Sequence, residues 1–358
     1  MLPEEKYRIV ADILATIDSV ARKEGVSVSL VGGVVRDILV YRDAGAFMED
    51  IDLVVEGDAR LIAREVAPHL SGNVELFDRF FTAKISRANF PSEIDLVSAR
   101  HERYECPGAL PTVSMGTLHQ DLQRRDFTIN AMALPLEPMI AYLRGEVTAE
   151  ALASEILDPL GGRDDLSAKI IRILHPQSFT DDPTRLFRAI RYGARLGASF
   201  CPLTDALFYD GIAKGDRDRI SANRVLQEVR KLSLEREPGL AFERAIKSGI
   251  LSHFLGVETA RAEDISRAGA RLAVLRHELG STHWWQIVQW LLIWAGMERS
   301  PRIELALERR RKDIATIYSE VEFARENRGE LIKSNAGVTA WYGLTGEGFN
   351  RVAALRAN

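Results

Sequence analysis

The sequence predicts an α+β protein, with an N-terminal head built from a mixed sheet and helices and an all-α remainder. Two observations predict this class. Up to about residue 160, short runs of alternating apolar residues lie a dozen or more positions apart, as in a sheet covered by helices. From Asp164 onward the apolar residues recur almost wholly at helical spacing. We expect a head over residues 1–160, a helical neck over 161–235 and a helical body and tail over 236–358.

The elements of the head follow from apolar periodicity and from turn signals. An amphipathic helix covers residues 4–23, and the strand that follows it stops at Gly32 and Gly33. The elements expected after that turn are a helix over 34–41, a strand over 50–55, a helix over 58–69, strands over 81–86 and 94–99, and a helix over 118–133. Residues 135–157 show no clear pattern.

The composition is that of a cytoplasmic protein. Its two cysteines, Cys106 and Cys201, lie far apart, which fits a reducing compartment and opposes a disulfide scaffold or a zinc ribbon. No apolar run reaches transmembrane length, so no membrane partner is expected. The net charge is −4, so binding to a polyanion would depend on local basic patches such as residues 185–195 and the RRRK run at 309–312.

The strand expected over residues 50–55 carries two acids, Asp50 and Asp52. Alternate side chains of a strand point to the same face, so these two lie roughly 6–7 Å apart at Cα. Carboxylates this close repel each other unless a cation lies between them, and a divalent cation is the usual solution. The alternative is a strand edge with two solvated acids.

The glycine pair lies between a strand and a helix. Gly32 and Gly33 let the backbone approach a phosphate closely, and the following helix start presents free N–H donors. Arg36, in the first turn of that helix, would add a charge-assisted contact to the same triphosphate. A common strand-to-helix turn is the alternative for the glycines alone.

A third acid, Asp95, lies in the middle of the strand expected over 94–99. A carboxylate is unfavourable there unless it is paired or used. It either completes a metal site or accepts a proton from an attacking hydroxyl. The alternative is a buried acid that Arg100 or Arg103 satisfies.

Five segments occur in order along residues 28–235, namely LVGGVVRDILV, EDIDLVVEGDA, RRDFTINAMAL, DPLGGRDDL and DDPTRLFRAIRYGARLG. Together they closely resemble the class II tRNA nucleotidyltransferase and bacterial poly(A) polymerase family. The resemblance implies a palm-like head with a helical neck, body and tail, and Mg²⁺ held by Asp50 and Asp52. It implies nucleotide contacts, or their support, from Gly32, Gly33, Arg36, Arg125, Asp126 and Asn130. A charged helix start with a capping aspartate is the alternative for the RRDFTIN segment alone.

The DDPTR segment bears on the choice of base. Asp182 and Arg185 lie three apart at an expected helix start and can reach one target. Cytosine and adenine each present an amino donor beside a ring-nitrogen acceptor, which suits a carboxylate and a guanidinium, whereas uracil and guanine present the reverse pattern. Arg188 and Arg191 are candidates for phosphate contacts. An N-cap with a local Asp–Arg bridge is the alternative, and Asp181 departs from the glutamate usual in the family.

The implied reaction is attack by a tRNA 3′-hydroxyl on the α-phosphate of ATP or CTP with release of pyrophosphate. The expected partners are therefore the tRNA 3′ end, ATP and CTP. Addition of a full CCA end, of CC alone or of A alone all occur in the family, and the intact PGALPTV segment disfavours CC alone. A poly(A) polymerase and a non-catalytic RNA-binding protein are the other hypotheses.

Overall fold

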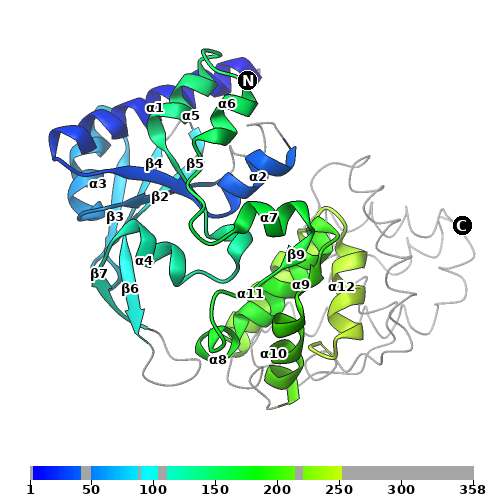
Figure 1. Cartoon of the computed structure of the whole chain (residues 1–358). Coiled ribbons are helices and arrows are strands. Elements are labelled where there is room, and N and C mark those ends of the chain that lie inside the picture. Colours follow the sequence, from blue (N-terminus) through cyan, green and yellow to red (C-terminus); the bar gives the residue numbers. More distant parts are fainter. Residues whose placement is uncertain (1–2, 42–49, 88–89, 104–110, 214–220, 252–358) are drawn as a thin grey trace, which may run out of the picture. The chain divides into compact units, whose positions relative to one another are not determined.

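The computed structural model describes residues 3–41, 50–87, 90–103, 111–213 and 221–251. The chain divides into two compact units, Met1–Ser178 and Phe179–Asn358 (Figure 1). The expected domain boundaries near residues 160 and 235 stay predictions. The RRRK run at 309–312 lies outside the described residues. Within the described ranges, no helix has the length and apolar character needed to cross a membrane.

Unit 1 is built on a six-stranded mixed sheet with the order β3-β4-β5-β2-β1-β8. Strands β2 and β5 are parallel, and their neighbours pair antiparallel. The strands are β1 (Val28–Val31), β2 (Asp50–Val55), β3 (Asn73–Phe77), β4 (Thr82–Arg87), β5 (Phe90–Ser98) and β8 (Ala133–Pro135). A separate antiparallel pair is formed by β6 (Arg100–Arg103) and β7 (Thr112–Met115).

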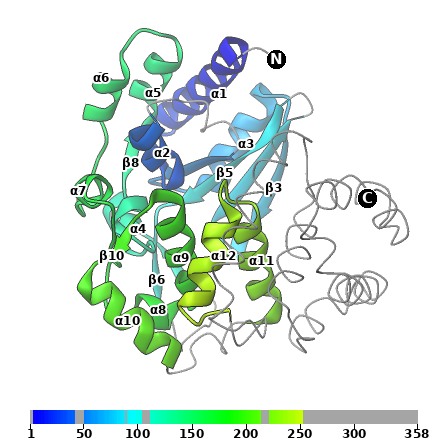
Figure 2. The same cartoon turned by 90° about the vertical axis from the view of Figure 1, so that its right-hand side faces the viewer.

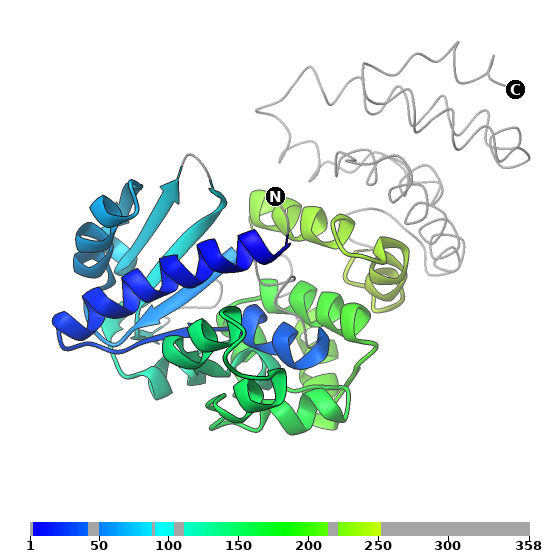
Figure 3. The same cartoon turned by 90° about the horizontal axis from the view of Figure 1, so that it is seen from above.

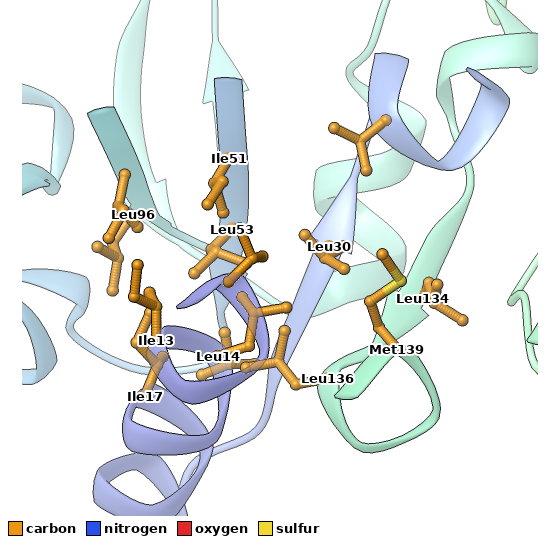
Figure 4. Close-up of a cluster of buried hydrophobic side chains, with 14 of the residues drawn as sticks. Ile13, Leu14, Ile17, Leu30, Ile51, Leu53, Leu96, Leu134, Leu136 and Met139 are labelled. Atoms are coloured by element: carbon orange, nitrogen blue, oxygen red, sulfur yellow. The ribbon is translucent and has the colours of Figure 1, made fainter. Parts of the chain in front are cut away.

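One face of this sheet carries the large hydrophobic core of unit 1. The helices α1 (Pro3–Lys23), α3 (Ala59–His69) and α5 (Leu136–Leu143) contribute their apolar faces to that core. Figure 3 shows α1, in dark blue, lying along the sheet. In Figure 4, Ile13, Leu14 and Ile17 of α1 point toward the strand residues Leu53 and Leu96. Each fully buried side chain of this kind stabilises the fold by roughly 1.5–3 kcal/mol, so α1 is an integral layer of the head.

The opposite face of the sheet is only partly covered. A smaller cluster there includes Val31, Val54 and Leu122. Because strand side chains alternate, Ile51 and Leu53 point into the large core while Asp52 and Val54 point to this second face. The amphipathic pattern of β2 therefore presents Asp52 on the face that the main core does not occupy.

The helix expected over residues 118–133 is wrong beyond its first half. Helix α4 (Leu118–Gln123) starts at a capping box in which Thr117 and Gln120 bond each other's backbone N–H groups. After α4 the chain runs through a 3₁₀ helix (Thr128–Asn130) and then enters β8. Phe127 forms an isolated bridge with Ile173, and this tertiary pairing overrides the local helical preference.

The segment DPLGGRDDL anchors this irregular stretch. Asp158 accepts hydrogen bonds from the backbone N–H groups of Gly162 (2.7 Å) and Arg163 (2.9 Å), at the start of α7 (Gly162–Ser167). A Cβ on Gly162 would lie 2.3 Å from the carbonyl oxygen of Thr128, so only glycine allows this approach. The region 135–157, which showed no pattern, contains α5 and α6 (Ala149–Ser154).

The described part of unit 2 is helical, apart from the two-residue strand β10 (Ser199–Phe200). Helix α9 packs against α11 and α12, which also contact each other (Figure 2). The helices that follow unit 1 are α8 (Ser178–Asp181), α9 (Thr184–Leu196), α10 (Pro202–Ala213), α11 (Ala222–Ser233) and α12 (Pro238–Lys247). The predicted class, a mixed sheet with helices followed by a helical region, is confirmed.

Candidate active site

The second face of the sheet carries a row of charged residues across three neighbouring strands. Asp52 of β2 lies in register with Asp95 of β5, and Asp95 lies in register with Lys84 of β4. Asp52 is exposed, and the Asp95 side chain is 37% exposed. Asp50 lies opposite Glu93 in the same register, and its side chain is outside the described set. The structure thus brings together two acids that are 43 positions apart in the sequence.

Lys84 is the cation of this row. Its Nζ donates to Glu93 Oε2 at 2.6 Å and lies 3.5 Å from Asp95 Oδ1. The hydrogen bond to Glu93 and the charges of Asp95 and Glu93 raise the pKa of Lys84 above its ordinary value. The ammonium therefore keeps its charge and offsets part of the repulsion among the acids. The sequence interpretation named Arg100 as a partner for Asp95, but Arg100 donates to Glu102 and to the carbonyl of Phe80.

The donor set of this face fits a divalent metal ion. Asp52 and Asp95 supply carboxylate oxygens, which are the ligands that hard cations prefer. Adjacent strands lie about 4.8 Å apart, so in-register carboxylates can share one ion. The described side chains include no group of three potential metal ligands. The side chain of Asp50 is not among the described side chains. Asp50 lies two residues before Asp52 on the same strand, and its role as a metal ligand stays a prediction.

The glycine pair forms the predicted turn between β1 and α2 (Gly33–Tyr41). Gly32 has a φ of +77°, a left-handed conformation that strongly favours glycine, and α2 begins at Gly33. A Cβ on Gly32 would lie 3.1 Å from Nη1 of Arg125, and a Cβ on Gly33 would lie 3.4 Å from Nη2 of Arg36. Two guanidinium groups therefore lie against the turn, which is the expected composition of a phosphate-binding site.

Arg36 is held inside unit 1, with 1% of its surface exposed. It donates to both carboxylate oxygens of Asp37 at 2.7 and 2.9 Å, and its Nη1 donates to Oδ1 of Asn130 at 2.7 Å. Asn130 in turn donates to Asp126 at 3.0 Å. Asp126 and Asn130, four positions apart, come together through the 3₁₀ turn. Both are buried, so their geometry supports Arg36, and a direct nucleotide contact stays a prediction.

Unit 2 contains the residues predicted to read the base. Oδ1 of Asp182 accepts from the N–H and hydroxyl of Thr184 at 3.1 and 2.7 Å and from Nη2 of Arg224 at 2.6 Å. Asp182 thus holds the first turn of α9 from the position before its N-cap, Pro183, and its ion pair is with the distant Arg224. Its Oδ2 receives no hydrogen bond from any residue that the structure describes. Arg185 lies in that first turn and is 6% exposed.

The other two arginines of α9 have partners within unit 2. Arg188 donates to the hydroxyl of Tyr192 at 3.2 Å. Arg191 lies 4.6 Å from the centroid of the Tyr192 ring and 3.3 Å from Glu235, whose carboxylate Arg195 also binds at 2.6 Å. Arg191 is 7% exposed. These contacts explain the arginine spacing of α9 without a ligand, and the phosphate contacts remain predictions.

Two residues of this face were missed from the sequence. Lys84 reaches the acids through strand register, which no local pattern predicts. Asp121 was detectable, because it precedes Arg124 and Arg125 by three and four positions, the spacing of side-chain partners at the end of a helix. It binds both of them, at 2.6 and 2.9 Å.

Two acids in register on neighbouring strands thus lie close to a glycine turn that opens a helix and has arginines packed against it. Proteins of this fold generally use a divalent metal. Residues 28–172 match the family model described as the poly A polymerase head domain. The chain therefore carries a region similar to this head domain, and it is similar to tRNA nucleotidyltransferases.

Similar proteins include two A-adding tRNA nucleotidyltransferases. That of Geobacter sulfurreducens is 41% identical over 62% of this chain and 23% of its own length. That of Halalkalibacterium halodurans is 35% identical over 77% of this chain and 60% of its own length. A solved structure of a CCA-adding enzyme is 26% identical, with a TM-score of 0.70 over 100% of this chain and 80% of the other. The chain thus covers less than two thirds of the length of the two A-adding relatives.

Proposed function

We propose that this chain is a template-independent tRNA nucleotidyltransferase that transfers AMP, CMP or both from ATP and CTP to the tRNA 3′ end. The observation that carries the proposal is the register of Asp52 with Asp95, next to the strand β1 that ends in the glycine turn. Carboxylates on neighbouring strands suit a reaction in which a hydroxyl attacks a phosphate and pyrophosphate leaves. The neighbouring turn and its arginines suit the triphosphate.

Each side chain has a defined task in this reaction. Asp50 and Asp52 would hold Mg²⁺, and Asp95 would either join them or accept the proton of the attacking 3′-hydroxyl. When bound, Mg²⁺ supplies Lewis-acid activation of that hydroxyl and stabilises the charge on the leaving phosphates. Gly32 and Gly33 admit the phosphates to the backbone, and Arg125 binds them from the side. Arg36 keeps the turn in place through its bonds to Asp37 and Asn130.

The base is proposed to bind at the start of α9, in a neck over residues 161–235. Oδ1 of Asp182 is held by Thr184 and Arg224, which leaves Oδ2 to accept from the amino group of cytosine or adenine. Arg185 would donate to the adjacent ring nitrogen. Uracil and guanine would leave both protein groups unpaired, and that cost excludes them.

AMP transfer to a tRNA that ends in CC is the activity best supported. Two similar proteins of 41% and 35% identity are named A-adding enzymes, whereas a CC-adding relative is 36% and a multifunctional CCA protein is 30% identical. A-adding and complete CCA-adding enzymes share this step, and CMP transfer separates them. A solved relative, 26% identical, was captured with a primer tRNA and an ATP analogue. We place the protein in the cytoplasm, with residues 236–358 as the tRNA-binding body and tail.

The test uses the full chain, Mg²⁺ and three tRNA transcripts that end before CCA, after C and after CC. Each transcript receives labelled ATP, labelled CTP or both. Extension of every transcript to CCA identifies a complete CCA-adding enzyme, and a single A on the CC-ended transcript identifies an A-adding enzyme. Long A tails identify a poly(A) polymerase, and no incorporation with any transcript overturns the proposal.

A further inference from the structure

Asp121 is a buried carboxylate in the last turn of α4 that the reaction described above does not use. None of its surface is exposed. Oδ1 accepts from Nε and Nη2 of Arg124 at 2.9 and 2.6 Å, and Oδ2 accepts from Nε and Nη2 of Arg125 at 3.3 and 2.9 Å. Burial acts to raise the pKa of Asp121, but the charges of Arg125 and Arg124 outweigh it and hold that pKa below its ordinary value. The carboxylate therefore stays ionised and keeps both guanidinium groups bound.

The ion pair with Asp121 occupies one edge of the Arg125 guanidinium and leaves the other edge available. Nε and Nη2 of Arg125 face Asp121, whereas Nη1 lies beside the glycine turn, 3.1 Å from where a Cβ of Gly32 would be. Within the described part of the chain, Nη1 donates no hydrogen bond. The Arg125 side chain is 17% exposed, so it is not sealed from solvent. A guanidinium fixed on one edge and open on the other is preorganised for an anion.

The ion pairs around Asp121 form a network that ends at Arg125. Arg124 binds Glu102 as well as Asp121, and Glu102 binds Arg100. The network contains three guanidinium groups, including that of Arg125, and two carboxylates. The guanidinium beside Gly32 lies at one end of this network.

We propose that Asp121 is a positioning residue that holds the guanidinium of Arg125 beside Gly32, with Nη1 directed to the triphosphate of the incoming nucleotide. The inference rests on the proposed function, because it takes the ligand of the glycine turn to be a triphosphate. Asp121 acts through Arg125 and touches no substrate. Its loss costs phosphate affinity because Arg125 must then be ordered when the ligand binds.

The experiment compares two double variants of the full chain. Asp121→Asn with Arg124→Gln removes one buried charge of each sign and releases Arg125. Glu102→Gln with Arg124→Gln also removes one buried charge of each sign, but leaves the pair of Asp121 with Arg125 intact. The readout is the inhibition constant of inorganic tripolyphosphate, which reports phosphate recognition without a base, together with the KM for ATP. Thermal unfolding shows that each variant is folded.

We expect the inhibition constant and the KM to rise about tenfold in the Asp121 variant, the loss of one charge-assisted contact, and less than about threefold in the Glu102 variant. In an Arg125→Ala background, adding Asp121→Asn should cause no further rise. Equal effects of the two double variants would show a merely structural role for Asp121 and overturn the inference. In that case Arg125→Ala would still weaken inhibition by tripolyphosphate, and the phosphate role of Arg125 would stand. If Arg125→Ala itself leaves inhibition unchanged, the phosphate role of Arg125 falls and the inference falls with it.

Discussion

The glycine turn of unit 1 and helix α9 of unit 2 both carry arginines that sequence motifs connect with a nucleotide, yet the two regions hold them differently. At the turn, Arg125 keeps one guanidinium edge open beside Gly32. On α9, Arg191 and Arg195 form ion pairs with Glu235, and Arg191 also lies over the ring of Tyr192. Arginine spacing in a motif therefore does not separate a ligand contact from an internal ion pair. The difference lies in which carboxylate each guanidinium meets in the fold.

The largest effect is expected at the acids of the sheet. Asp52→Ala should lower nucleotide incorporation by about 100- to 1,000-fold or more, because it removes charge stabilisation at the reacting phosphate. Single-turnover incorporation into the CC-ended transcript measures this, with tRNA binding followed in parallel. Glu65→Gln, an exposed acid of α3, is the control and should leave the rate unchanged. Incorporation at the wild-type rate in Asp52→Ala would contradict the assignment of Asp52 as a metal ligand.

A structural role for the α9 arginines predicts a loss of stability at Glu235. Glu235→Gln leaves Arg191 and Arg195 without their shared carboxylate and should lower the free energy of unfolding by about 3 kcal/mol. Urea denaturation measures this. Glu243→Gln, which breaks the pair with Lys247 one turn along α12, should change it by less than about 1 kcal/mol. Equal small effects would mean that Glu235 does not stabilise α9.

Base selection should weaken at the start of α9. Arg185→Ala is expected to reduce discrimination against UTP and GTP by about 10- to 100-fold, because one base contact to a charged group is lost. The measurement compares kcat/KM for the four nucleotides on the CC-ended transcript. Arg230→Ala, an exposed arginine near the end of α11, is the matched control. Unchanged discrimination in Arg185→Ala would reject the base-reading role.

The smallest expected effect is on the pH dependence of stability. The pKa of Asp121 is lowered in the folded protein, so its ionised form contributes stability above the unfolded pKa of about 3.9, and this contribution is lost as pH falls through the folded pKa. The difference in unfolding free energy between wild type and Asp121→Asn should be constant from neutral pH to about pH 5 and shrink below about pH 4. Denaturation at several pH values measures it. A constant difference down to pH 3 would contradict the assignment.

Much of the head could be predicted because its signals are local. The amphipathic helix near the N-terminus, the strand from Asp50 to Val55 and the glycine turn all depend on short-range periodicity or on a backbone conformation that favours glycine. The helix expected through Ala133 failed because Phe127 pairs with a strand-like segment at Ile173. A contact over that distance in the chain leaves no periodic trace around residue 127.

The sequence by itself determined the class of the sheet and helices, the face of β2 that carries its acids, and the residues that resemble a nucleotidyltransferase. Only the tertiary structure decided which residues lie together. It brings Asp95 next to Asp52 and Lys84, Arg125 next to Gly32, and Arg191 next to Glu235. The physical reason is that side-chain alternation and helix start signals act over a few residues. Ion pairs and strand register instead join residues that are distant in the chain, and the packing of the core brings these residues close together.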